Sequence, residues 1–367
     1  MHQEPSGVRI MAYTAIDDPS AYFHTQLYTG DGEASLAITN DANAGDFSPD
    51  WLWIKNRTSG GGTGPNYVLD TTRGNTKDVN ADKAEAEHTE STVLLSFDID
   101  GFSVGSAGVV NNDTDNYVAW QWKANGGSRT TNAEDGNNPA GGYQANTTAG
   151  FSIVDYTGTG AAGTMAHGLG AVPDLIIIKN RDEADDWAVY HSANTAAPET
   201  DYLVLNETDA TADDATYWND TAPTSSVFTV TTAHNVNADA ETYMAFCFKS
   251  IQGYSKFGGY TGNGDADGPF VYTGFKPAWV LAKSNGGENW NINDNKRSPI
   301  NPTEIKLSPN TSDAEAESIG YAIDFLSNGF KIRHDGGDHN SSGVTYIYAA
   351  FAESPFVTSG GVPCTAR

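Results

Sequence analysis

The chain has 367 residues and carries 20 lysines and arginines against 47 aspartates and glutamates, a net charge of −27. A chain this acidic repels phosphates and anionic lipid headgroups, so its charge argues against nucleic acid and membrane surfaces as partners. Two cysteines, Cys247 and Cys364, are too few for a disulfide framework, and no apolar run approaches the ~18 residues of a membrane-spanning helix. The 39 glycines and 17 tyrosines favour strands joined by turns.

Residues 1–23 are expected to form an amino-terminal arm. The first residues lack the basic start and the apolar run of a signal peptide, so we expect none. Met11 is an alternative to Met1 as the start, because the sequence that follows Met11 is more typical of a natural beginning.

A short motif, Tyr-Thr-Gly-x-Gly, opens each of three similar stretches of the chain. Its copies begin at Tyr28, Tyr156 and Tyr260. The pattern is typical of a strand that ends in a tight, glycine-dependent turn. It does not indicate a dinucleotide-binding loop, because no helical pattern follows it.

A proline-led apolar run follows each motif, within Phe47–Arg57, Ala171–Arg181 and Phe275–Asn285. Each run has five residues dominated by Trp, Leu, Ile and Val, and a lysine closes it. The run is too short for a buried helix and rich in β-branched and aromatic residues, so it predicts a core strand with the proline at its start. Lys-Asn-Arg ends two copies and Lys-Ser-Asn ends the third, and we expect these residues to anchor a loop.

A hairpin and a closing strand complete each stretch. Asp-Gly and Asn-Gly between alternating apolar residues predict hairpins at Leu95–Val104 and Ile323–Ile332. The closing strands begin at Tyr117, Tyr243 and Tyr348, which lie 68, 70 and 71 residues after Pro49, Pro173 and Pro277. This near-constant spacing indicates a tandem repeat of one β domain.

The sequence therefore predicts an all-β protein with three tandem β-sandwich, jelly-roll-like repeats. The predicted parts are an N-terminal arm (1–23), repeat 1 (24–124), a Gly/Asn/Thr linker (125–150), repeat 2 (151–251), repeat 3 (252–356) and a C-terminal tail (357–367). Because hardly any linker separates the last two repeats, we expect them to dock rigidly, with the first set apart.

No catalytic, cofactor-binding or metal-binding residue is predicted, and the binding residues stay undetermined. Asp98-Ile-Asp-Gly101 and Asp265-Ala-Asp-Gly268 lack the third acidic ligand and the closing glutamate of a calcium loop. No zinc-ligand spacing, Gly-x-Ser-x-Gly elbow or phosphate loop occurs. Five histidines are expected in loops or at the surface: His167, His191, His234, His334 and His339.

The tryptophans raise the question of sugar binding. Trp51 and Trp53 alternate along one strand, as do Trp120 and Trp122 along another, so the members of each pair share a face. On a solvated face such pairs stack sugars, but these strands also supply the core, and we favour core packing. Cys247 is likewise expected to be a small core residue.

Several motifs in order resemble a known family. They are Tyr22–Gly32, Pro49–Arg57, Phe248–Gly258, Tyr260–Gly264, Gly268–Pro277, Ile323–Phe330 and Tyr348–Phe356. Together they resemble an uncharacterised β-rich repeat-domain family of virion and tail proteins in tailed bacteriophages, especially marine ones. The likeness covers about residues 13–356, and Ala278 stands where that family usually has aspartate.

The resemblance implies a non-enzymatic virion structural protein, in the tail or its fibres, that assembles as a homo-oligomer. It implies no cofactor, and its partners would be copies of itself, other virion proteins and a host-surface glycan. The protein would be made in the host cytoplasm and end in the virion. The alternatives are a carbohydrate-binding, lectin-like adhesin, a capsid decoration protein and a glycan-degrading tail enzyme.

Overall fold

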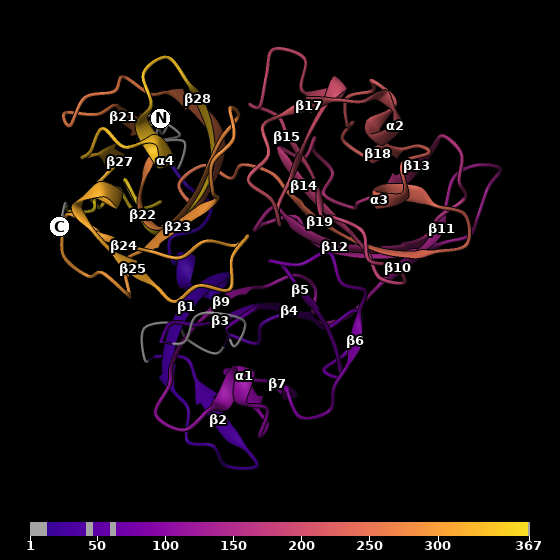
Figure 1. Cartoon of the computed structure of the whole chain (residues 1–367), viewed down its shortest axis with the longest axis horizontal. Coiled ribbons are helices and arrows are strands. Elements are labelled where there is room, and N and C mark those ends of the chain that lie inside the picture. The colour runs from indigo at the N-terminus through magenta and orange to yellow at the C-terminus, as the bar shows by residue number, and fades with distance from the viewer. Residues whose placement is uncertain (1–12, 42–46, 59–63, 366–367) are drawn as a thin grey trace, which may run out of the picture.

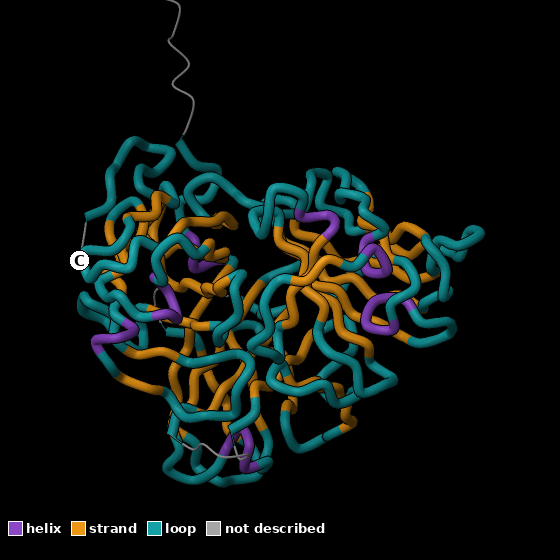
Figure 2. Tube along the Cα trace, turned by 45° about the horizontal axis from the view of Figure 1, so that its top comes forward, coloured by secondary structure: helices purple, strands orange, loops and turns teal. Residues whose placement is uncertain are grey.

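The computed structural model describes residues 13–41, 47–58 and 64–365, and the alternative starts Met1 and Met11 lie outside the described residues. The chain is all-β, which confirms the predicted class: antiparallel strands form several sheets, and the helices are short turns (Figure 2). The strands gather into three lobes around a common centre (Figure 1).

The lobes follow one another along the chain. The first lobe contains η1 (Pro19–Ala21), β1 (Phe23–Thr29), β2 (Leu36–Thr39), β3 (Trp51–Asn56), β4 (Asn66–Asp70), β5 (Lys77–Asn80), β6 (His88–Thr89), β7 (Leu94–Asp98), β8 (Gly101–Val104), α1 (Gly108–Asn111) and β9 (Asn116–Trp122). The second contains β10 (Thr130–Asn132), β11 (Ala140–Asn146), β12 (Phe151–Thr157), β13 (Gly163–Ala166), β14 (Leu175–Asn180), β15 (Ala188–His191), η2 (Pro198–Thr200), β16 (Asp201–Val204), β17 (Ala212–Asp213), α2 (Ala215–Trp218), β18 (Val227–Val230), α3 (His234–Asn237) and β19 (Thr242–Phe248). The third contains β20 (Ser255–Thr261), β21 (Phe270–Tyr272), β22 (Phe275–Ser284), β23 (Asn291–Asp294), β24 (Ile305–Lys306), β25 (Ala316–Glu317), η3 (Ile319–Tyr321), β26 (Ile323–Leu326), β27 (Gly329–Ile332), α4 (Gly337–Asn340) and β28 (Thr345–Pro355).

Each lobe is a sandwich of a large and a small antiparallel sheet. The large sheets have the orders β1-β9-β3-β4-β5-β6, β10-β11-β12-β19-β14-β15-β16-β17 and β20-β28-β22-β23. The small sheets that complete the sandwiches are β2-β8-β7, β13-β18 and β21-β27-β26, and in the third lobe β24 and β25 form a further two-stranded sheet. The strands that have a counterpart in every lobe are therefore arranged in the same order in all three lobes. That the lobes are copies of one unit stays an interpretation of the sequence, which this common order supports.

The proline-led runs become the central strands β3, β14 and β22, and each is buried on both faces. In β3, Trp51 and Trp53 face the centre of the molecule, while Leu52 and Ile54 face the interior of the first lobe. Burial on both faces explains why these runs are continuously apolar and do not alternate with polar residues.

The three large sheets face one another, so their inner faces form one central core shared by all lobes. Each lobe also has a core of its own between its two sheets. The first lobe is therefore not set apart from the others, contrary to our expectation. Trp51, for example, stacks on Phe246 of the second lobe with ring centroids 4.6 Å apart.

The stretch 125–150 departs from the expected linker, because it adds β10 and β11 to the large sheet of the second lobe. A side chain at Gly141 would place its Cβ 2.1 Å from the carbonyl oxygen of Asp155, so this glycine allows close strand pairing. Gln144 is fully buried and donates to Thr71 (2.8 Å) and Thr72 (2.6 Å) of the first lobe. The Gly/Asn/Thr composition thus serves close contact between chain segments.

The described parts of the arm and the tail pack on the third lobe. Thr14 donates to the carbonyl of Gln252 (3.0 Å), and Ile16 is buried in the central core. In the tail, the backbone N–H of Ser359 donates to the carboxylate of Asp17 (2.6 Å). The two ends of the described chain therefore hold each other against the same lobe.

The Tyr-Thr-Gly-x-Gly motif packs one strand of each lobe (β1, β12 and β20) against the last strand of that lobe and a short helix. Its tyrosine stacks on the closing tyrosine at 5.0–5.2 Å between ring centroids, in the pairs Tyr28–Tyr117, Tyr156–Tyr243 and Tyr260–Tyr346. The third closing tyrosine is thus Tyr346, and our assignment of Tyr348 was wrong. The two residues share a face of β28, so residue type alone did not separate them.

The two glycines of the motif have different roles. A Cβ at Gly30 would lie 2.2 Å from the carbonyl oxygen of Asn112, so the first glycine allows the chain to approach the end of α1. The second glycine, Gly32, has a φ of +69°, which few other residues adopt without strain.

We predict that Gly30→Ala destabilises the protein by about 1–3 kcal/mol or more, because the new methyl group overlaps a backbone oxygen that cannot move freely. Gly108→Ala is the matched control, since the nearest atom to its Cβ would be 3.8 Å away. Chemical denaturation measures both, and equal stability of the two variants would contradict this account of the motif.

Candidate functional site

A buried lysine lies at each of the three junctions between lobes. Lys55, Lys179 and Lys283 close the three central strands and are 0% exposed. Each ammonium group donates to backbone carbonyls of its own lobe and to one carbonyl of the next lobe. The acceptors in the next lobe are Thr311 for Lys55, Ala84 for Lys179 and Thr208 for Lys283, each at 3.0 Å. The lobes are thus joined in a ring: first to third, third to second, and second to first.

A second donor beside each lysine repeats the same connection. Trp187 donates its indole N–H to the carbonyl of Asn80 (2.9 Å), and Trp290 donates to Val204 (2.8 Å). Asn66 takes this position in the first lobe and donates to Thr311 (2.9 Å). Each large sheet therefore holds a turn of the neighbouring lobe by two side-chain donors.

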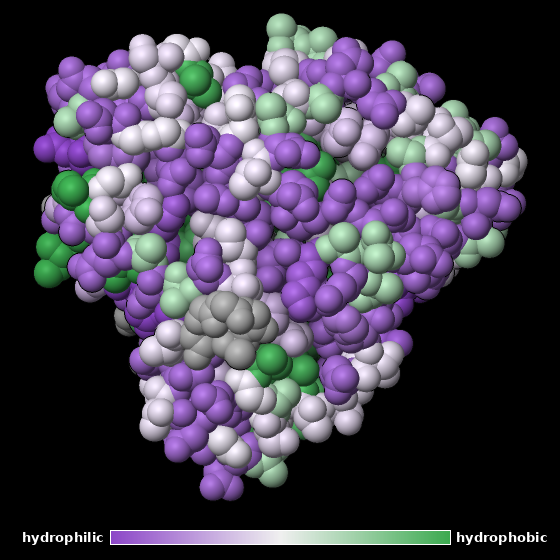
Figure 3. All heavy atoms as spheres, viewed as in Figure 1, coloured by the Kyte–Doolittle hydropathy of each residue, from purple (hydrophilic) through white to green (hydrophobic). Residues whose placement is uncertain are grey.

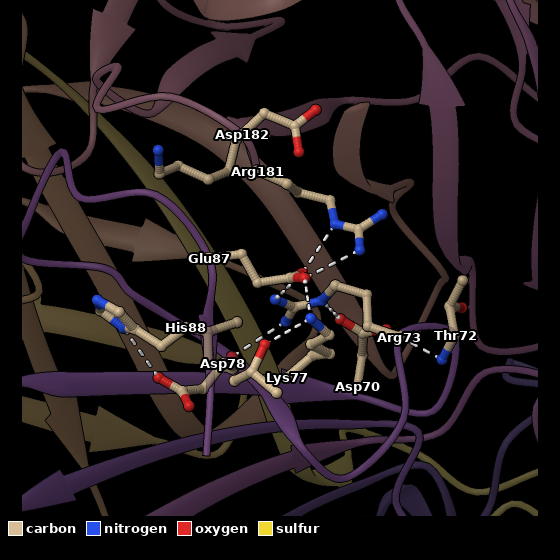
Figure 4. A network of polar contacts seen from close by, with 12 residues as sticks. Asp70, Thr72, Arg73, Lys77, Asp78, Glu87, His88, Arg181 and Asp182 are labelled. Carbon is tan, nitrogen blue, oxygen red and sulfur yellow. Dashed lines mark hydrogen bonds and ion pairs between the residues drawn. The ribbon is translucent and has the colours of Figure 1, made fainter. Parts of the chain in front are cut away.

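A charged network lies beside the lysine at the junction of the first and second lobes (Figure 4). Arg181 of the second lobe makes two parallel contacts with Glu87 of the first, at 2.8 and 3.0 Å. Glu87 also contacts Arg73 (3.3 Å) and Lys77 (3.4 Å), and Arg73 is held by Asp70 at 2.6 Å. Burial opposes ionisation of Glu87, but Arg181, Arg73 and Lys77 outweigh it and lower the pKa of its carboxyl.

The junction of the first and third lobes has the same arrangement. Arg57 makes two contacts with Glu315, at 2.8 and 2.9 Å. Arg297 lies 3.9 Å from Glu315 and is held by Asp294 at 2.6 Å. The pairs Arg181–Glu87 and Arg57–Glu315 therefore correspond, and so do Arg73 and Arg297.

The third junction replaces the whole charged network by neutral residues. The backbone N–H of Thr211 donates to the carbonyl of Asn285 (2.9 Å). At the other two junctions, the backbone N–H groups of Glu87 and Glu315 donate in the same way to the carbonyls of Arg181 and Arg57. The hydroxyl of Thr211 donates to Asn194 (2.7 Å). Asn285, Thr211 and Asn194 thus stand where the other two junctions have arginine, glutamate and arginine. A buried ion pair with one partner removed is costly, whereas replacing the whole group is not.

The expectation that the Lys-Asn-Arg residues anchor a loop is confirmed, because Lys179 donates to the carbonyls of Glu183 and Asp185 in the loop after β14. The same residues also join one lobe to the next, which we did not predict. The sequence did hold a signal for this role. The arginine is lost only in the third copy, where Asn285 stands, and the matching acid is lost only in the second, where Thr211 stands. The order of neighbours in the ring, which pairs these two positions, was not visible in the sequence.

All eight tryptophans are buried, with at most 2% of each exposed. The prediction of core packing for Trp51, Trp53, Trp120 and Trp122 is confirmed. Cys247 is also buried in a lobe core, as predicted. These residues therefore offer no platform for a sugar.

The expectation that these histidines lie in loops or at the surface is confirmed for three of the five: His167 and His334 lie in loops, and His234 is exposed. It is wrong for His191 in β15 and His339 in α4, which are buried within these elements. His167, His191, His334 and His339 are buried. Burial lowers the pKa of His191 to about 4, although the hydrogen bond with the carbonyl of Tyr348 (3.1 Å) acts to raise it. Sequence spacing does not show the burial of His191 in a strand or of His339 in a short helix.

The two acidic turns serve the local structure. Asp98 accepts hydrogen bonds from Ser96 (2.6 Å) and Ser103 (2.7 Å), and Asp267 pairs with Lys331 (2.8 Å). Among residues 13–41, 47–58 and 64–365, no three His, Cys, Asp or Glu side chains are placed to hold a metal ion. No helix in these ranges is long and apolar enough to cross a membrane.

Two of the cavities formed by the described residues lie beside charged side chains. One, of about 440 Å³, lies between the first and third lobes, and its charged groups pair with each other, as His24 and Lys296 do with Asp41. The other, of about 390 Å³, belongs to the first lobe and is lined by Asp78, Asn80 and His88 among others. In each cavity a carboxylate pairs with a histidine, Asp41 with His24 and Asp78 with His88, and each lining also has buried oxygens without a hydrogen-bond partner.

Residues 18–355 match the family described as Domain of unknown function (DUF7483), and the chain belongs to that family. The matched range runs from just before β1 to the end of β28, so the family unit contains all three lobes. A search of curated proteins finds no match.

We predict that Glu87→Gln lowers the free energy of unfolding by roughly 3 kcal/mol, because Arg73 and Arg181 lose a buried charged partner. Glu85→Gln is the matched control: Glu85 lies in the same loop but is 50% exposed, and its pair with Lys83 contributes little. Denaturant titration compares the two. Equal stability would mean that the network does not hold the lobes together.

The buried lysines give a second, pH-dependent prediction. Burial lowers the pKa of Lys179 from its usual 10.5 to about 8, although Asp185 and Asp186 raise it. Between these pH values the unfolded chain keeps a proton that the folded chain has lost, so wild-type stability rises with pH. The Lys179→Met variant has no proton to lose at this position, so its stability does not rise with pH for this reason. The stability gap between wild type and variant should therefore widen by on the order of 3 kcal/mol from pH 8 to 10.5.

Denaturant titrations across that pH range measure the gap. Lys83→Met, which removes a partly exposed lysine, is the control. A gap for Lys179→Met that stays constant over the same range would contradict the burial of a charged group at this junction.

Proposed function

We propose that this member of the family is a non-enzymatic structural protein of a bacteriophage virion, in which one chain supplies a rigid block with three lobes. The observation that supports this best is the ring of junctions. Each lobe holds the next through a buried lysine and a second side-chain donor, around a core that all three share. A body held in this way transmits force between its lobes without hinge motion.

The sequence resemblance to virion and tail proteins gives the proposal its biological setting. A tail or tail-fibre component acts in many identical copies, so weak contacts between copies add up through multivalency. The surface is mostly hydrophilic in the view of Figure 3, and the net charge of −27 keeps free subunits soluble before they assemble. The partners would be copies of the chain and neighbouring virion proteins.

A second candidate function, binding of a host-surface glycan, is favoured by two exposed aromatic residues. Phe270 and Tyr272 lie on the outer face of β21 and are 46% and 49% exposed. The corresponding positions hold Ala37 and Thr39 in the first lobe and Thr164 and Ala166 in the second, judged by the pairing of each strand with its neighbour. Only the third lobe thus presents aromatic rings there, and exposed rings stack on sugars.

The location of the protein tests the proposal. Antibody against the purified chain should label the tails of particles banded on a density gradient from a lysate of the source phage. Labelled heads would favour the capsid decoration alternative, and unlabelled particles would contradict a virion role.

Activity is tested separately. A host-polysaccharide turnover assay with the purified chain is expected to show no cleavage, and cleavage would contradict the non-enzymatic role. A glycan array with wild type and with the Phe270→Ala/Tyr272→Ala variant tests the second candidate. Selective binding that the variant loses would place the glycan on β21.

A further inference from the structure

The cavity of about 390 Å³ in the first lobe lies at one end of the sandwich, between β5 and the segment that leads into α1. Its lining combines polar and apolar side chains. The residues are Tyr67, Asp78, Asn80, Lys83, Glu85, His88, Glu90, Val93, Ala107 and Val109.

Two buried acceptor oxygens in this lining have no partner within the protein. Asp78 is 1% exposed; one carboxylate oxygen lies 3.3 Å from His88, and the other, Oδ2, has no hydrogen bond (Figure 4). Asn80 is 2% exposed, and its Oδ1 likewise has no donor. A buried acceptor without a donor is costly, so two of them beside a cavity point to a ligand that donates.

The charge around the cavity is negative. Glu85 and Glu90 lie at its rim, and Lys83 is already paired with Glu85 at 3.2 Å. Burial raises the pKa of Tyr67, and the carboxylates of Asp78, Asp82 and Glu90 raise it further. The potential in this cavity therefore favours a cation over a neutral donor.

At the corresponding positions, the other two lobes have side chains that pair within their own lobe. Asp78 of the first lobe corresponds to Tyr202 of the second and to Lys306 of the third. This alignment follows from strand pairing, because the residue that follows each of the three pairs with an equivalent residue of the neighbouring strand in its own lobe. In the third lobe, the ammonium of Lys306 pairs with Asp338 and lies 4.0 Å from the ring centroid of Tyr321. In the second, Tyr202 stacks on Tyr217 at 3.8 Å.

The first lobe has the opposite chemistry at these positions. Asp78 stands where the third lobe has Lys306, and Val109 stands where the third lobe has Asp338, at the second position of the short helix. The third lobe thus supplies an ammonium group of its own, whereas the first lobe supplies acceptors and an apolar wall, and leaves the space open.

We propose that the first lobe binds a short alkyl diamine in this cavity. One ammonium group donates to Asp78 Oδ2 and Asn80 Oδ1, the alkyl chain lies against Val93, Ala107 and Val109, and the second ammonium group meets Glu85 and Glu90 at the rim. The proposal is independent of the virion role, since it depends only on the lining of the first lobe.

Calorimetric titration with 1,5-diaminopentane tests the proposal on the full chain. The diamine is expected to bind with 1:1 stoichiometry, pentylamine more weakly, and 1,5-pentanediol not at all, because the diol has the same length without charge. Asp78→Asn keeps the shape of the side chain and should lower the affinity by about tenfold or more, since it removes a charged hydrogen bond.

Two further variants separate specific binding from attraction to an acidic protein. Glu134→Gln removes an exposed carboxylate elsewhere and should leave the affinity unchanged. Asp78→Lys/Val109→Asp gives the first lobe the ion pair of the third, which should fill the cavity and abolish binding while the chain stays folded. Equal affinity of wild type and Asp78→Asn, no heat with the diamine, or displacement of the diamine by equimolar Ca²⁺ would each overturn the proposal.

Discussion

The structure depends on burying both faces of the large sheets. In each lobe, alternate residues of the central strand face the lobe core and the molecular centre, so a lobe by itself would expose a broad apolar face. Apolar burial at about 25 cal/mol per Å² drives the three faces together but fixes no angle between them. The lysines provide that direction, because an ammonium group removed from water requires acceptors at fixed positions. Each lysine finds one of these acceptors in the next lobe.

The junctions are alike in geometry but differ in charge. Two carry Arg–Glu–Arg networks and one carries Asn–Thr–Asn, and each set is complete in itself. A lobe placed at the wrong junction would bring an unpaired arginine or glutamate into a buried position. The difference therefore favours one order of the lobes around the ring, which acts against misassembly or exchange of lobes between chains.

Much of the fold followed from local sequence rules. The apolar runs, the Asp-Gly and Asn-Gly hairpins and the buried tryptophans all lie where short-range patterns place them. The partners of the lysines did not follow, since Lys55 and Thr311 are 256 residues apart and the acceptor is a backbone carbonyl of no particular residue type. The stretch 125–150 misled because glycine serves flexible linkers and close strand contacts equally well. The cavity of the first lobe did not follow from the sequence either. It became apparent only when the residues of the three lobes were aligned by strand pairing.

The central claim is that the three lobes form one cooperative body. Differential scanning calorimetry of the full chain tests it most directly, through the ratio of the calorimetric to the van't Hoff enthalpy of unfolding. The shared core and the ring of junctions predict a single transition with a ratio near one. Separate transitions, with one lobe melting while the other two remain folded, would contradict the account.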